Sequence, residues 1–399
     1  MEALLPYSVS DETLDLATEL DAWRQVLDVR VLSRSWGGRL RRDLEAEAVA
    51  ASTRMEGVNV TVDEVRRILA GDQPPHVETE DRQLVEGYRD AMNFVLRQAD
   101  DPAFTWDRGL VVGLHDRVLA GRYDRGAGRL RTDRQVWVRD RRTGNEVYLP
   151  PPGGQVDALL EDTVSRMRTG PQHSAIAAAW IHVAVAAIHP FGDGNGRSAR
   201  ILASLAMYRG GFKLREFTSL EEWWGRHVND YYDLFGCLGP EFDRSTDVTA
   251  FIHGHLSAQL HQVRALDLRG RTEQQIWTAA EEAAEEVGMD RRLANALWDA
   301  FFGREVTAGY YRSLTDVSPA TATKDLSGAV AARLLASRGQ RRGRRYSAGE
   351  RLYAAVADAL FVDIDSAESP RDRIIAELGR RLTSSGEAFG FPRRPLSEA

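Results

Sequence analysis

The residues between positions 188 and 200 combine side chains that can bind a polyphosphate and transfer part of it. Arg197 and Arg200 stand three positions apart, so a helix would place both on one face, where they could bind successive phosphates. Asp193 offers hard oxygen ligands that suit Mg²⁺ beside a polyphosphate. His189 could take a proton from an incoming hydroxyl, because an imidazole titrates near neutral pH. In outline, this is a nucleotide-dependent transfer site.

Two helices would position these side chains. Residues 173–188 are apolar almost throughout and predict a buried helix. Pro190 should end that helix near His189, because a proline disfavours helical geometry at the residue before it. Residues 196–208 predict a second helix, with Asn195 as its N-cap. The connecting loop is rich in glycine, and the free N–H groups and dipole of a helix N-terminus make such a place an anion site, with phosphate as the obvious anion.

This segment resembles the signature of the Fic family, His-x-Phe-x-(Asp/Glu)-Gly-Asn-Gly-Arg-x-x-Arg, and every specified position from His189 to Arg200 matches. Family members usually carry a side chain where this chain has Gly192, so the loop is expected to be looser here. A plainer alternative is a glycine-rich helix connection with a capping Asn195 and two solvated arginines. The length of the matching pattern favours the family.

The resemblance implies an enzyme that transfers AMP from ATP to a Ser, Thr or Tyr hydroxyl, on a target protein or on itself. His189 would deprotonate the attacking hydroxyl, and Asp193 would hold Mg²⁺ that bridges the phosphates. Arg197 and Arg200 would neutralise charge on the leaving pyrophosphate, while Phe191 would anchor the loop in the core. The residues that the resemblance assigns to nucleotide binding are Gly192, Gly194, Asn195, Gly196, Arg197, Arg200, Tyr231 and Tyr232.

A second motif lies near the N-terminus. Residues 39–55 predict a helix that ends at Glu56, with Gly57 as a natural C-cap and Ser52 one turn before Glu56 on the same face. A surface serine and a glutamate beside a helix end are the plain alternative. The segment resembles the (Ser/Thr)-x-x-x-Glu-(Gly/Asn) inhibitory motif of Fic proteins, in the class that carries this helix before the catalytic core. The resemblance implies that Glu56 pairs with Arg200 and pulls it away from the γ-phosphate.

Three other functions stay open. The same site could mainly remove AMP from a modified protein, with Glu56 positioning water, and members of the broader family move other phosphate-containing groups. The chain could also be a DNA-binding regulator whose Fic core only senses nucleotide. His189 and Asp193 argue against this, because sensing needs no base. A P-loop or Rossmann site is excluded, since no G-x-x-x-x-G-K-[ST] pattern occurs and the glycine loop follows a predicted helix.

Residues 128–138 and 145–149 have extended character and predict a small hairpin, which resembles the family's target-binding flap or is a plain surface hairpin. Tyr231 and Tyr232 resemble the aromatics that flank the nucleotide base, with core packing as the alternative.

His182 is expected to be a core histidine bonded to backbone. We expect His253, His255 and His261 to lie on a solvated helix face. The other helices expected in this part of the chain cover about 10–27, 81–98, 107–119, 246–268 and 273–288.

The C-terminal part resembles a winged helix-turn-helix domain. Residues 308–314 and 319–332 predict two helices, the second capped by Ser318, and residues 338–346 predict a basic hairpin tip. Between positions 307 and 346, eight basic and two acidic residues give a net charge of +6. Arg333 departs from the pattern, which usually has a glycine there. The alternative is a basic solvated loop on a helical packing domain. The basic residues are Arg312, Lys324, Arg333, Arg338, Arg341, Arg342, Arg344 and Arg345.

The bulk properties are those of a soluble globular protein with about two or three domains in 399 residues and a net charge of −7. A single cysteine, Cys237, excludes an intramolecular disulfide and a cysteine-cluster zinc site. No signal peptide is visible and the most apolar run is too short for a bilayer, so we expect a cytoplasmic protein without a membrane partner. The expected partners are a target protein and, through the C-terminal domain, DNA; a homodimer stays open.

The predicted fold is mainly α: a Fic-type helical core with a small β-hairpin flap, plus a C-terminal winged-helix domain. We expect helices near 350–360 and 370–382, and an unstructured tail over 383–399. The expected domains are an N-terminal helical segment with the inhibitory helix at 1–100, the Fic core at 101–240, a helical connector at 241–300, the winged helix at 301–350, and C-terminal helices and tail at 351–399.

Overall fold

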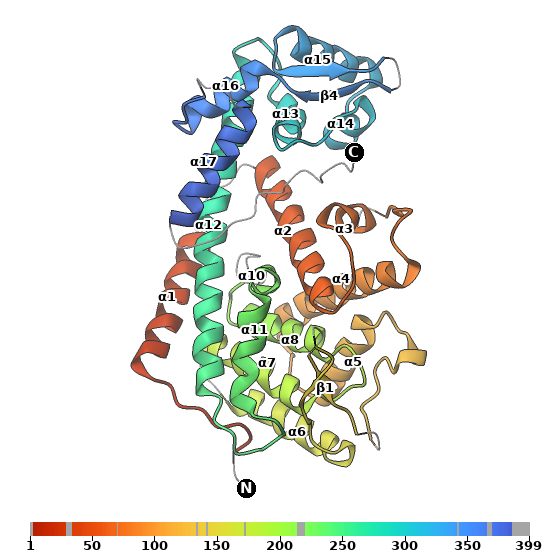
Figure 1. The fold of residues 1–399 in the computed structure, drawn as a ribbon, viewed down its shortest axis with the longest axis vertical. Coiled ribbons are helices and arrows are strands. Elements are labelled where there is room, and N and C mark those ends of the chain that lie inside the picture. The colour runs from red at the N-terminus through yellow and green to blue at the C-terminus, as the bar shows by residue number, and fades with distance from the viewer. Residues whose placement is uncertain are drawn as a thin grey trace. The chain divides into compact units, whose positions relative to one another are not determined.

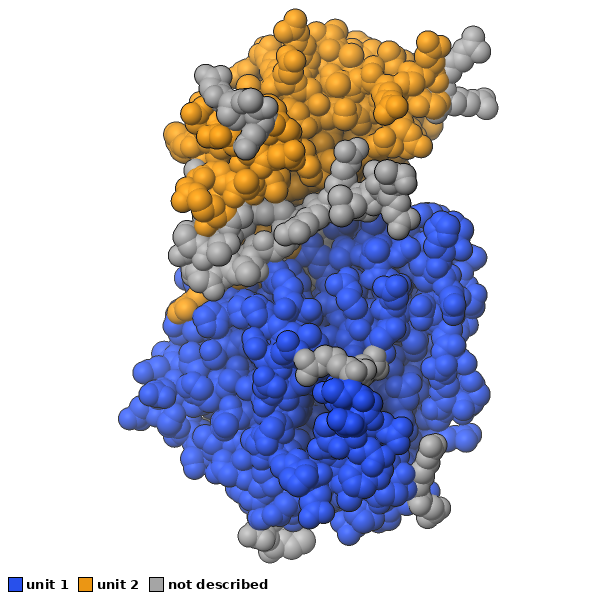
Figure 2. Space-filling model, viewed as in Figure 1, with its two compact units in different colours: residues 1–263 blue, residues 264–399 orange. Residues whose placement is uncertain are grey.

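The protein is described by a computed structural model that covers residues 3–28, 34–69, 71–132, 135–140, 143–170, 173–213, 220–340, 343–364 and 369–384. These residues form a mainly helical fold with two small antiparallel hairpins (Figure 1). The chain divides into two compact units, residues 1–263 and residues 264–399 (Figure 2). Arg341, Arg342 and most of the predicted tail lie outside the described residues. Over the described ranges, every helix is too short or too polar to cross a bilayer.

In the described part of the chain, six α-helices, one short 3₁₀ helix and one hairpin precede the predicted site. Asp107 caps α5, because its side chain accepts a hydrogen bond of 2.7 Å from the N–H of Leu110. The hairpin pairs Val138 with Tyr148, and its strands are shorter than the extended segments that the sequence predicts. The elements are α1 (Asp11–Asp28), α2 (Arg34–Met55), α3 (Val62–Leu69), α4 (Thr79–Asp100), α5 (Arg108–Val118), β1 (Val138–Arg139), β2 (Glu146–Tyr148) and α6 (Gly153–Thr169).

Two helices at the centre of unit 1 pack against each other and carry the loop of interest between them. They are α7 (Ser174–Ile188) and α8 (Asn195–Arg209). Nearly every residue of α7 is buried, as its alanine-rich apolar sequence requires. Around this pair, α4 packs against α8 and α2 packs against α10 (Leu220–Arg226), which brings the predicted inhibitory helix into the core. A second short helix, α11 (Val228–Leu234), begins after a break at His227 and carries Tyr231 and Tyr232.

The two helices predicted over 246–268 and 273–288 are one continuous helix, α12 (Thr249–Glu285), so the predicted break is wrong. Gly270 lies where the break was expected, and a single glycine weakens a helix by only about 1 kcal/mol. Two ion pairs span this point at the i,i+4 spacing that stabilises helices: Arg269 with Glu273 at 2.8 Å and Arg271 with Asp267 at 2.7 Å. They offset the cost of the glycine.

The predicted solvated histidine face on α12 is also wrong for His255 and His261, which pack inward, whereas His253 is partly exposed and lies 3.3 Å from the hydroxyl of Thr13. His255 is 2% exposed and lies in an aromatic cluster with Phe251 and His182. His261 stacks on Trp223, with ring centroids 5.4 Å apart. Apolar partners on α7 and α10 therefore cover a helix face that its histidines alone would leave in water.

Unit 2 contains two helices joined by a short turn, followed by a hairpin. Thr307 and Ser318 cap α14 and α15 with their side-chain oxygens, as their positions before helical segments favour. Arg333 has a φ of +60°, the left-handed conformation that favours glycine, so the chain adopts the expected backbone there at a steric cost. The elements are α13 (Ala294–Phe301), α14 (Ala308–Thr315), α15 (Pro319–Ala331), β3 (Leu335–Arg338), β4 (Arg345–Ala348), α16 (Glu350–Ala359) and α17 (Pro370–Ser384).

Candidate active site

The loop after α7 begins with a residue in an unusual backbone conformation. His189 has φ +50° and ψ +59°, which ends the helix and turns the chain sharply. Arg131 holds this turn: its Nε donates to the carbonyl of His189 at 2.7 Å and its Nη2 to that of Ile188 at 2.9 Å. The N–H of Arg131 also donates to the carbonyl of Pro190 at 3.0 Å. A residue distant in sequence therefore stabilises the strained start of the loop.

Replacing Arg131 with methionine should lower the free energy of unfolding by about 2–3 kcal/mol, because two buried carbonyls lose their donors. Chemical denaturation of the full chain measures this change. Arg129→Met is the matched control: Arg129 is exposed, so its replacement should change stability by less than about 0.5 kcal/mol. Equal losses in the two variants would show that the carbonyl contacts contribute nothing.

The imidazole of His189 is half-buried and has one hydrogen-bond contact, from Nδ1 to the carbonyl of Ala186 at 3.4 Å. A carbonyl only accepts, so this contact places the ring hydrogen on Nδ1 and leaves the lone pair on Nε2. Burial lowers the pKa of His189 to about 4. The ring is therefore neutral at physiological pH, which is the state that a general base requires.

Asn195 does not cap α8, contrary to the sequence prediction. The N-cap is Gly194, with φ +75°, and Asn195 is the first residue of the helix. Its side chain instead closes the loop on Phe191: Oδ1 accepts from the N–H of Phe191 and Nδ2 donates to its carbonyl, both at 2.9 Å. Phe191 is fully buried, as predicted for the residue that anchors the loop. The amide of Asn195 is thus engaged by the loop backbone in this conformation.

His115 supports the loop from α5, and no motif in the sequence pointed to it. Its Nδ1 accepts from the N–H of Gly128 at 3.1 Å, so the ring hydrogen lies on Nε2, which donates to the carbonyl of Asp193 at 2.8 Å. The ring also stacks on Phe191 with centroids 3.6 Å apart. Burial lowers the pKa of His115 to about 4, so the neutral form is maintained. His115 is a support for the loop, because the contact that it makes is to backbone.

The glycines of the loop differ in what surrounds them. A Cβ on Gly194 would lie 3.3 Å from Nε2 of His115, and one on Gly196 would lie only 2.5 Å from Oε1 of Glu56. Gly196 therefore permits a close approach of the Glu56 carboxylate to the N-terminus of α8. Gly192 is exposed and has no atom within 4 Å of a Cβ position, so a side chain would fit there without contact.

Arg197 lies buried at the base of the loop with most of its guanidinium unpaired. Its Nη2 lies 3.2 Å from Oδ1 of Asp193, which also accepts from the N–H of Gly194 at 2.6 Å. Within the described part of the chain, Nε and Nη1 of Arg197 have no hydrogen-bond partner. A buried cation with unpaired donors beside a helix N-terminus is suited to an anion.

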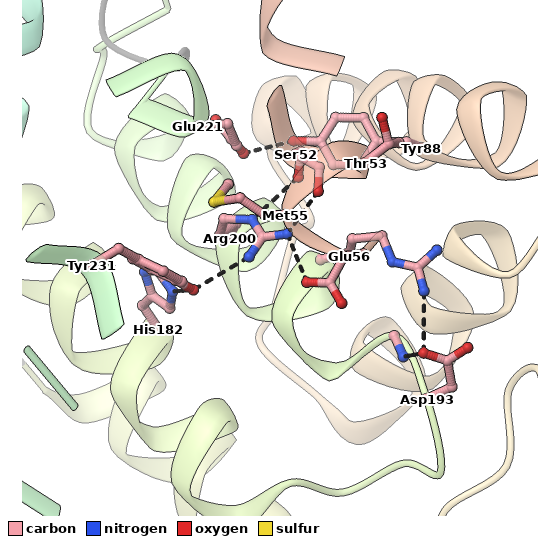
Figure 3. A network of polar contacts seen from close by, with 12 residues as sticks. Ser52, Thr53, Met55, Glu56, Tyr88, His182, Asp193, Arg200, Glu221 and Tyr231 are labelled. Atoms are coloured by element: carbon pink, nitrogen blue, oxygen red, sulfur yellow. Dashed lines mark hydrogen bonds and ion pairs between the residues drawn. The ribbon is translucent and has the colours of Figure 1, made fainter. Parts of the chain in front are cut away.

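Arg200 is also buried, but here every nitrogen has a partner (Figure 3). Nε donates to the hydroxyl of Ser52 at 3.1 Å, and Nη2 donates to the Ser52 carbonyl at 3.2 Å and to Oε1 of Glu56 at 2.9 Å. Nη1 donates to the hydroxyl of Tyr231 at 3.2 Å. Ser52 in the last turn of α2 and Glu56 directly after it therefore supply most of the partners, and Gly57 follows with φ +87°. The ion pair between Glu56 and Arg200 that the resemblance implied is present.

Tyr231 is buried, and its hydroxyl lies between Arg200 and Nε2 of His182, 3.1 Å from the latter. In this conformation its ring packs in the core, which was the alternative to a base-flanking role. Burial raises the pKa of Tyr231 to about 12. His182 is a core histidine as expected, although its partner is this side chain instead of backbone. Tyr232 is exposed, so its predicted contact with a nucleotide base stays a prediction.

The hairpin β1–β2 lies next to the same loop. The hydroxyl of Tyr148 in β2 donates to the carbonyl of Ala187 near the end of α7, at 2.9 Å. Trp137 and Val147 are exposed at the hairpin, so apolar side chains remain available on this element. Part of the predicted turn, at Arg142, lies outside the described residues. The predicted role of the hairpin as a target-binding flap stays a prediction.

Comparison with known proteins places this site in a family. Residues 105–207 match the model of the Fic/DOC family. Protein adenylyltransferase fic-1 of Caenorhabditis briggsae is 36% identical over 129 residues, which are 31% of this chain and 24% of the relative. The Caenorhabditis elegans protein of the same name is 29% identical over 204 residues, 49% of this chain and 39% of the relative. The chain thus spans well under half the length of these curated relatives.

Two solved structures share the fold. A Fic family protein from Desulfovibrio desulfuricans G20 aligns over 86% of this chain and 98% of its own, with a TM-score of 0.57 and 20% identity. Fic-1 from C. elegans aligns over 65% of this chain and 73% of its own, with a TM-score of 0.52 and 20% identity. At this level of identity the likeness concerns the fold.

Proposed function

Because this chain belongs to the Fic family, we propose that it is a protein adenylyltransferase, which transfers AMP from ATP to a hydroxyl side chain of a protein. The relatives named protein adenylyltransferase support the general class of reaction. The observation that carries the proposal is the neutral His189 at the entrance of a loop whose far end is a helix N-terminus with a buried Arg197, of which Nε and Nη1 have no hydrogen-bond partner among the described residues. A proton acceptor and an anion site thus lie on one short segment.

In the proposed reaction, the hydroxyl oxygen of the target residue attacks the α-phosphorus of ATP. Nε2 of His189 takes the hydroxyl proton, the bond from the α-phosphorus to the bridging oxygen breaks, and pyrophosphate leaves. Arg197 and Arg200 supply positive charge to the departing pyrophosphate. The N–H groups of the loop and of the first turn of α8 donate hydrogen bonds to the remaining phosphate oxygens, as helix N-termini commonly do.

The residues present fit Mg²⁺ with ATP. Asp193 is partly exposed, and Oδ1 is oriented by the N–H of Gly194 and by Arg197. In the part of the chain that the structure describes, no three His, Cys, Asp or Glu side chains come close enough together to hold a metal ion. A single carboxylate together with substrate phosphates and water is the usual way in which Mg²⁺ is bound. When bound, the ion would neutralise phosphate charge, and Asp193 would hold it.

We assign the conformation described above to the inhibited state. The Glu56 carboxylate forms an ion pair with Arg200 and lies against Gly196. We infer that phosphate oxygens would otherwise lie at this place. A guanidinium that is held by Ser52 and Glu56 is not free to bind a γ-phosphate. Ser52, Glu56 and Gly57 would therefore act together as the restraint, with Ser52 fixing the arginine and Gly57 ending the helix. We place the Fic core at residues 101–240 and the restraint in the preceding segment.

Mass spectrometry of the full chain, incubated with ATP and Mg²⁺, tests the proposed function. We expect the mass of the protein to increase by one AMP, with the modification on a Ser, Thr or Tyr residue. Incubation with a non-hydrolysable ATP analogue blocked between the α- and β-phosphates is the control and should give no increase. Absence of AMP from both the chain and added protein substrates, with intact ATP binding, would contradict the proposal.

A second proposal concerns residues 301–350, which we assign as a DNA-binding winged helix. Helix α15 begins with a capped turn after α14, and the hairpin β3–β4 follows it. Asp325, one of the two acidic residues between positions 307 and 346, is buried and paired with Arg292 at 2.9 Å. Its charge is therefore compensated internally, and exposed bases dominate the surface of this stretch. The exposed bases of the described part are Arg312, Lys324, Arg333, Arg338, Arg344 and Arg345.

Arg338→Gln and Arg344→Gln, made singly in the full chain, should each weaken binding to duplex DNA and lower the log–log salt slope by about one, because each phosphate contact releases counterions. Fluorescence anisotropy over a salt series measures both effects. Arg351→Gln, on α16, is the control: its partner is Glu286, at 3.1 Å, so its slope should equal that of the unchanged protein. A full chain that does not bind a duplex at low salt would favour the packing-domain alternative.

A further inference from the structure

A small cavity next to Arg200 collects polar atoms that have no partner. His182, Glu221, Trp224 and His255 line it, and each is only 1% or 2% exposed. Among the described residues, four of their atoms make no hydrogen bond: Nδ1 of His182, Oε2 of Glu221, Nε1 of Trp224 and Nε2 of His255. Buried polar atoms without a partner cost free energy. Four of them around one cavity indicate a ligand that pairs with them.

The hydrogen-bonding capacities of these atoms complement each other. Trp224 Nε1 is a donor only. The hydroxyl of Tyr231 accepts from Arg200, so it can give its own hydrogen to Nε2 of His182, which places the His182 ring hydrogen on Nδ1 and makes that atom a second donor. Oε2 of an ionised Glu221 accepts, and Nε2 of a neutral His255 can accept as well. Burial lowers the pKa of His182 well below its usual range and that of His255 to about 3, so both rings are neutral.

One water molecule matches this arrangement. It accepts two hydrogen bonds and donates two, and buried waters typically make two to four. The cavity has about 10 Å³ of room for the centre of a water molecule, which is close to what one water needs. Two histidines and a glutamate also suggest a metal, but the described side chains contain no group placed to hold one. The observations therefore favour water.

The residues that line the cavity include Arg200 but not Glu56. Figure 3 shows Tyr231 and His182 on one side of Arg200 and Glu56 on the other, with Glu221 above Arg200 and hydrogen-bonded to Tyr88. The other oxygen of Glu221 accepts from the hydroxyl of Tyr88 at 2.6 Å, which fixes the carboxylate on its own helix α10. Burial raises the pKa of Glu221, while Tyr88 and Arg200 act in the opposite direction.

We propose that the cavity binds one buried water molecule, which joins Glu221 to His182, His255 and Trp224 and makes Glu221 a second, fixed counter-ion of Arg200. Glu56 is then the counter-ion that can leave, and Glu221 the one that stays. An arginine that is almost fully buried needs compensating charge in every state of the protein. Glu221 supplies it after Glu56 has moved away, so Glu221 is a positioning residue and Arg200 keeps its place.

The consequence for ATP rests on the proposed function. If Arg200 had no other counter-ion, the departure of Glu56 would leave a buried cation without compensating charge or force Arg200 into solvent. With Glu221 and its water in place, the guanidinium stays ordered for the γ-phosphate. The experiments below use no ATP, so a failure of AMP transfer would not affect their outcome, and their failure would not affect the proposed transferase.

A double-mutant cycle of thermal unfolding on the full chain tests the second counter-ion. Glu56→Gln or Glu221→Gln alone leaves Arg200 one carboxylate, whereas the double variant leaves none. We expect the double variant to lose at least about 2–4 °C more in Tm than the sum of the two single losses. Glu222→Gln is the matched control: Glu222 is the next residue, is buried and pairs with Arg226, so its loss should simply add to that of Glu56→Gln. Additive losses for Glu221 and Glu56 would overturn the proposal.

A crystal structure of the unchanged protein at a resolution that shows ordered solvent tests the water directly, even if a variant does not fold. We expect one water within hydrogen-bonding distance of Oε2 of Glu221 and of at least two of the other three atoms. A cavity without density, a metal ion in the cavity, or rings rotated so that His182 and His255 pair with each other would each overturn the proposal.

Discussion

His189→Ala should lower the rate of AMP transfer by about 10²–10⁴-fold, or roughly 3–5 kcal/mol of barrier, while ATP still binds. The imidazole of His189 lies at the start of this loop and is neutral, so its Nε2 can take the hydroxyl proton. The phosphate-binding part of the site depends on Arg197 and on the N-terminus of α8, both of which remain in the variant. Transfer measured with labelled ATP and binding measured by calorimetry separate the two effects.

The control for this prediction is His76→Ala, because His76 is an exposed histidine outside the site and its replacement should leave transfer unchanged. A transfer rate of the His189 variant equal to that of the unchanged protein would remove the assigned role of His189.

The pH profile gives an independent check. A base works in its neutral form, and burial lowers the pKa of His189 to about 4. The rate should therefore stay flat as the pH falls from 8 to 5 and decrease only near pH 4, provided that the protein remains folded. An acid limb centred near pH 6.5 would indicate a histidine in ordinary solvent, and the stated environment of His189 would be wrong.

Glu56→Gly should raise AMP transfer, by about a hundredfold if the pairing of Glu56 with Arg200 leaves the α-phosphate of ATP misplaced by as little as about 1 Å. The carboxylate holds Nη2 of Arg200 at 2.9 Å and occupies the approach to Gly196. Charge-assisted hydrogen bonds of this kind are strong, so the arginine does not bind the γ-phosphate while the pair persists. Removing Glu56 frees the guanidinium and the space beside the helix N-terminus together. Self-modification with labelled ATP measures the increase.

Replacing Arg200 with alanine provides the contrast. It removes the restraint and the useful phosphate contact at once, so this variant should not be activated. A Glu56→Gly protein no faster than the unchanged one would contradict the inhibitory pairing. If Glu56→Gly also loses an ability of the unchanged protein to strip AMP from a modified target, removal of AMP becomes the main reaction, because Glu56 would then have positioned the water.

Short-range physics determined much of this structure from sequence alone. Pro190 and the loop glycines end α7 and permit the turn into α8, and Ser318 caps its helix as expected. These effects act within one or two helical turns, so residue order is enough to locate them. The chemistry of the segment from His189 to Arg200 also came from residue types and spacing, whereas the pairing of Glu56 with Arg200 was implied by the family resemblance.

Only the tertiary structure decided which distant residues support that chemistry. Arg131 and His115 lie far from the loop in sequence and contact its backbone, which carries no sequence signal. The tertiary structure also decided the position of Tyr231, for which the local pattern allowed either core packing or a nucleotide contact. The i,i+4 ion pairs that carry α12 through Gly270 outweighed a helix-breaking signal, and inward packing overrode the predicted histidine face. Burial and long-range hydrogen bonds depend on which surfaces meet after folding, and the one-dimensional pattern contains the residues but not their neighbours.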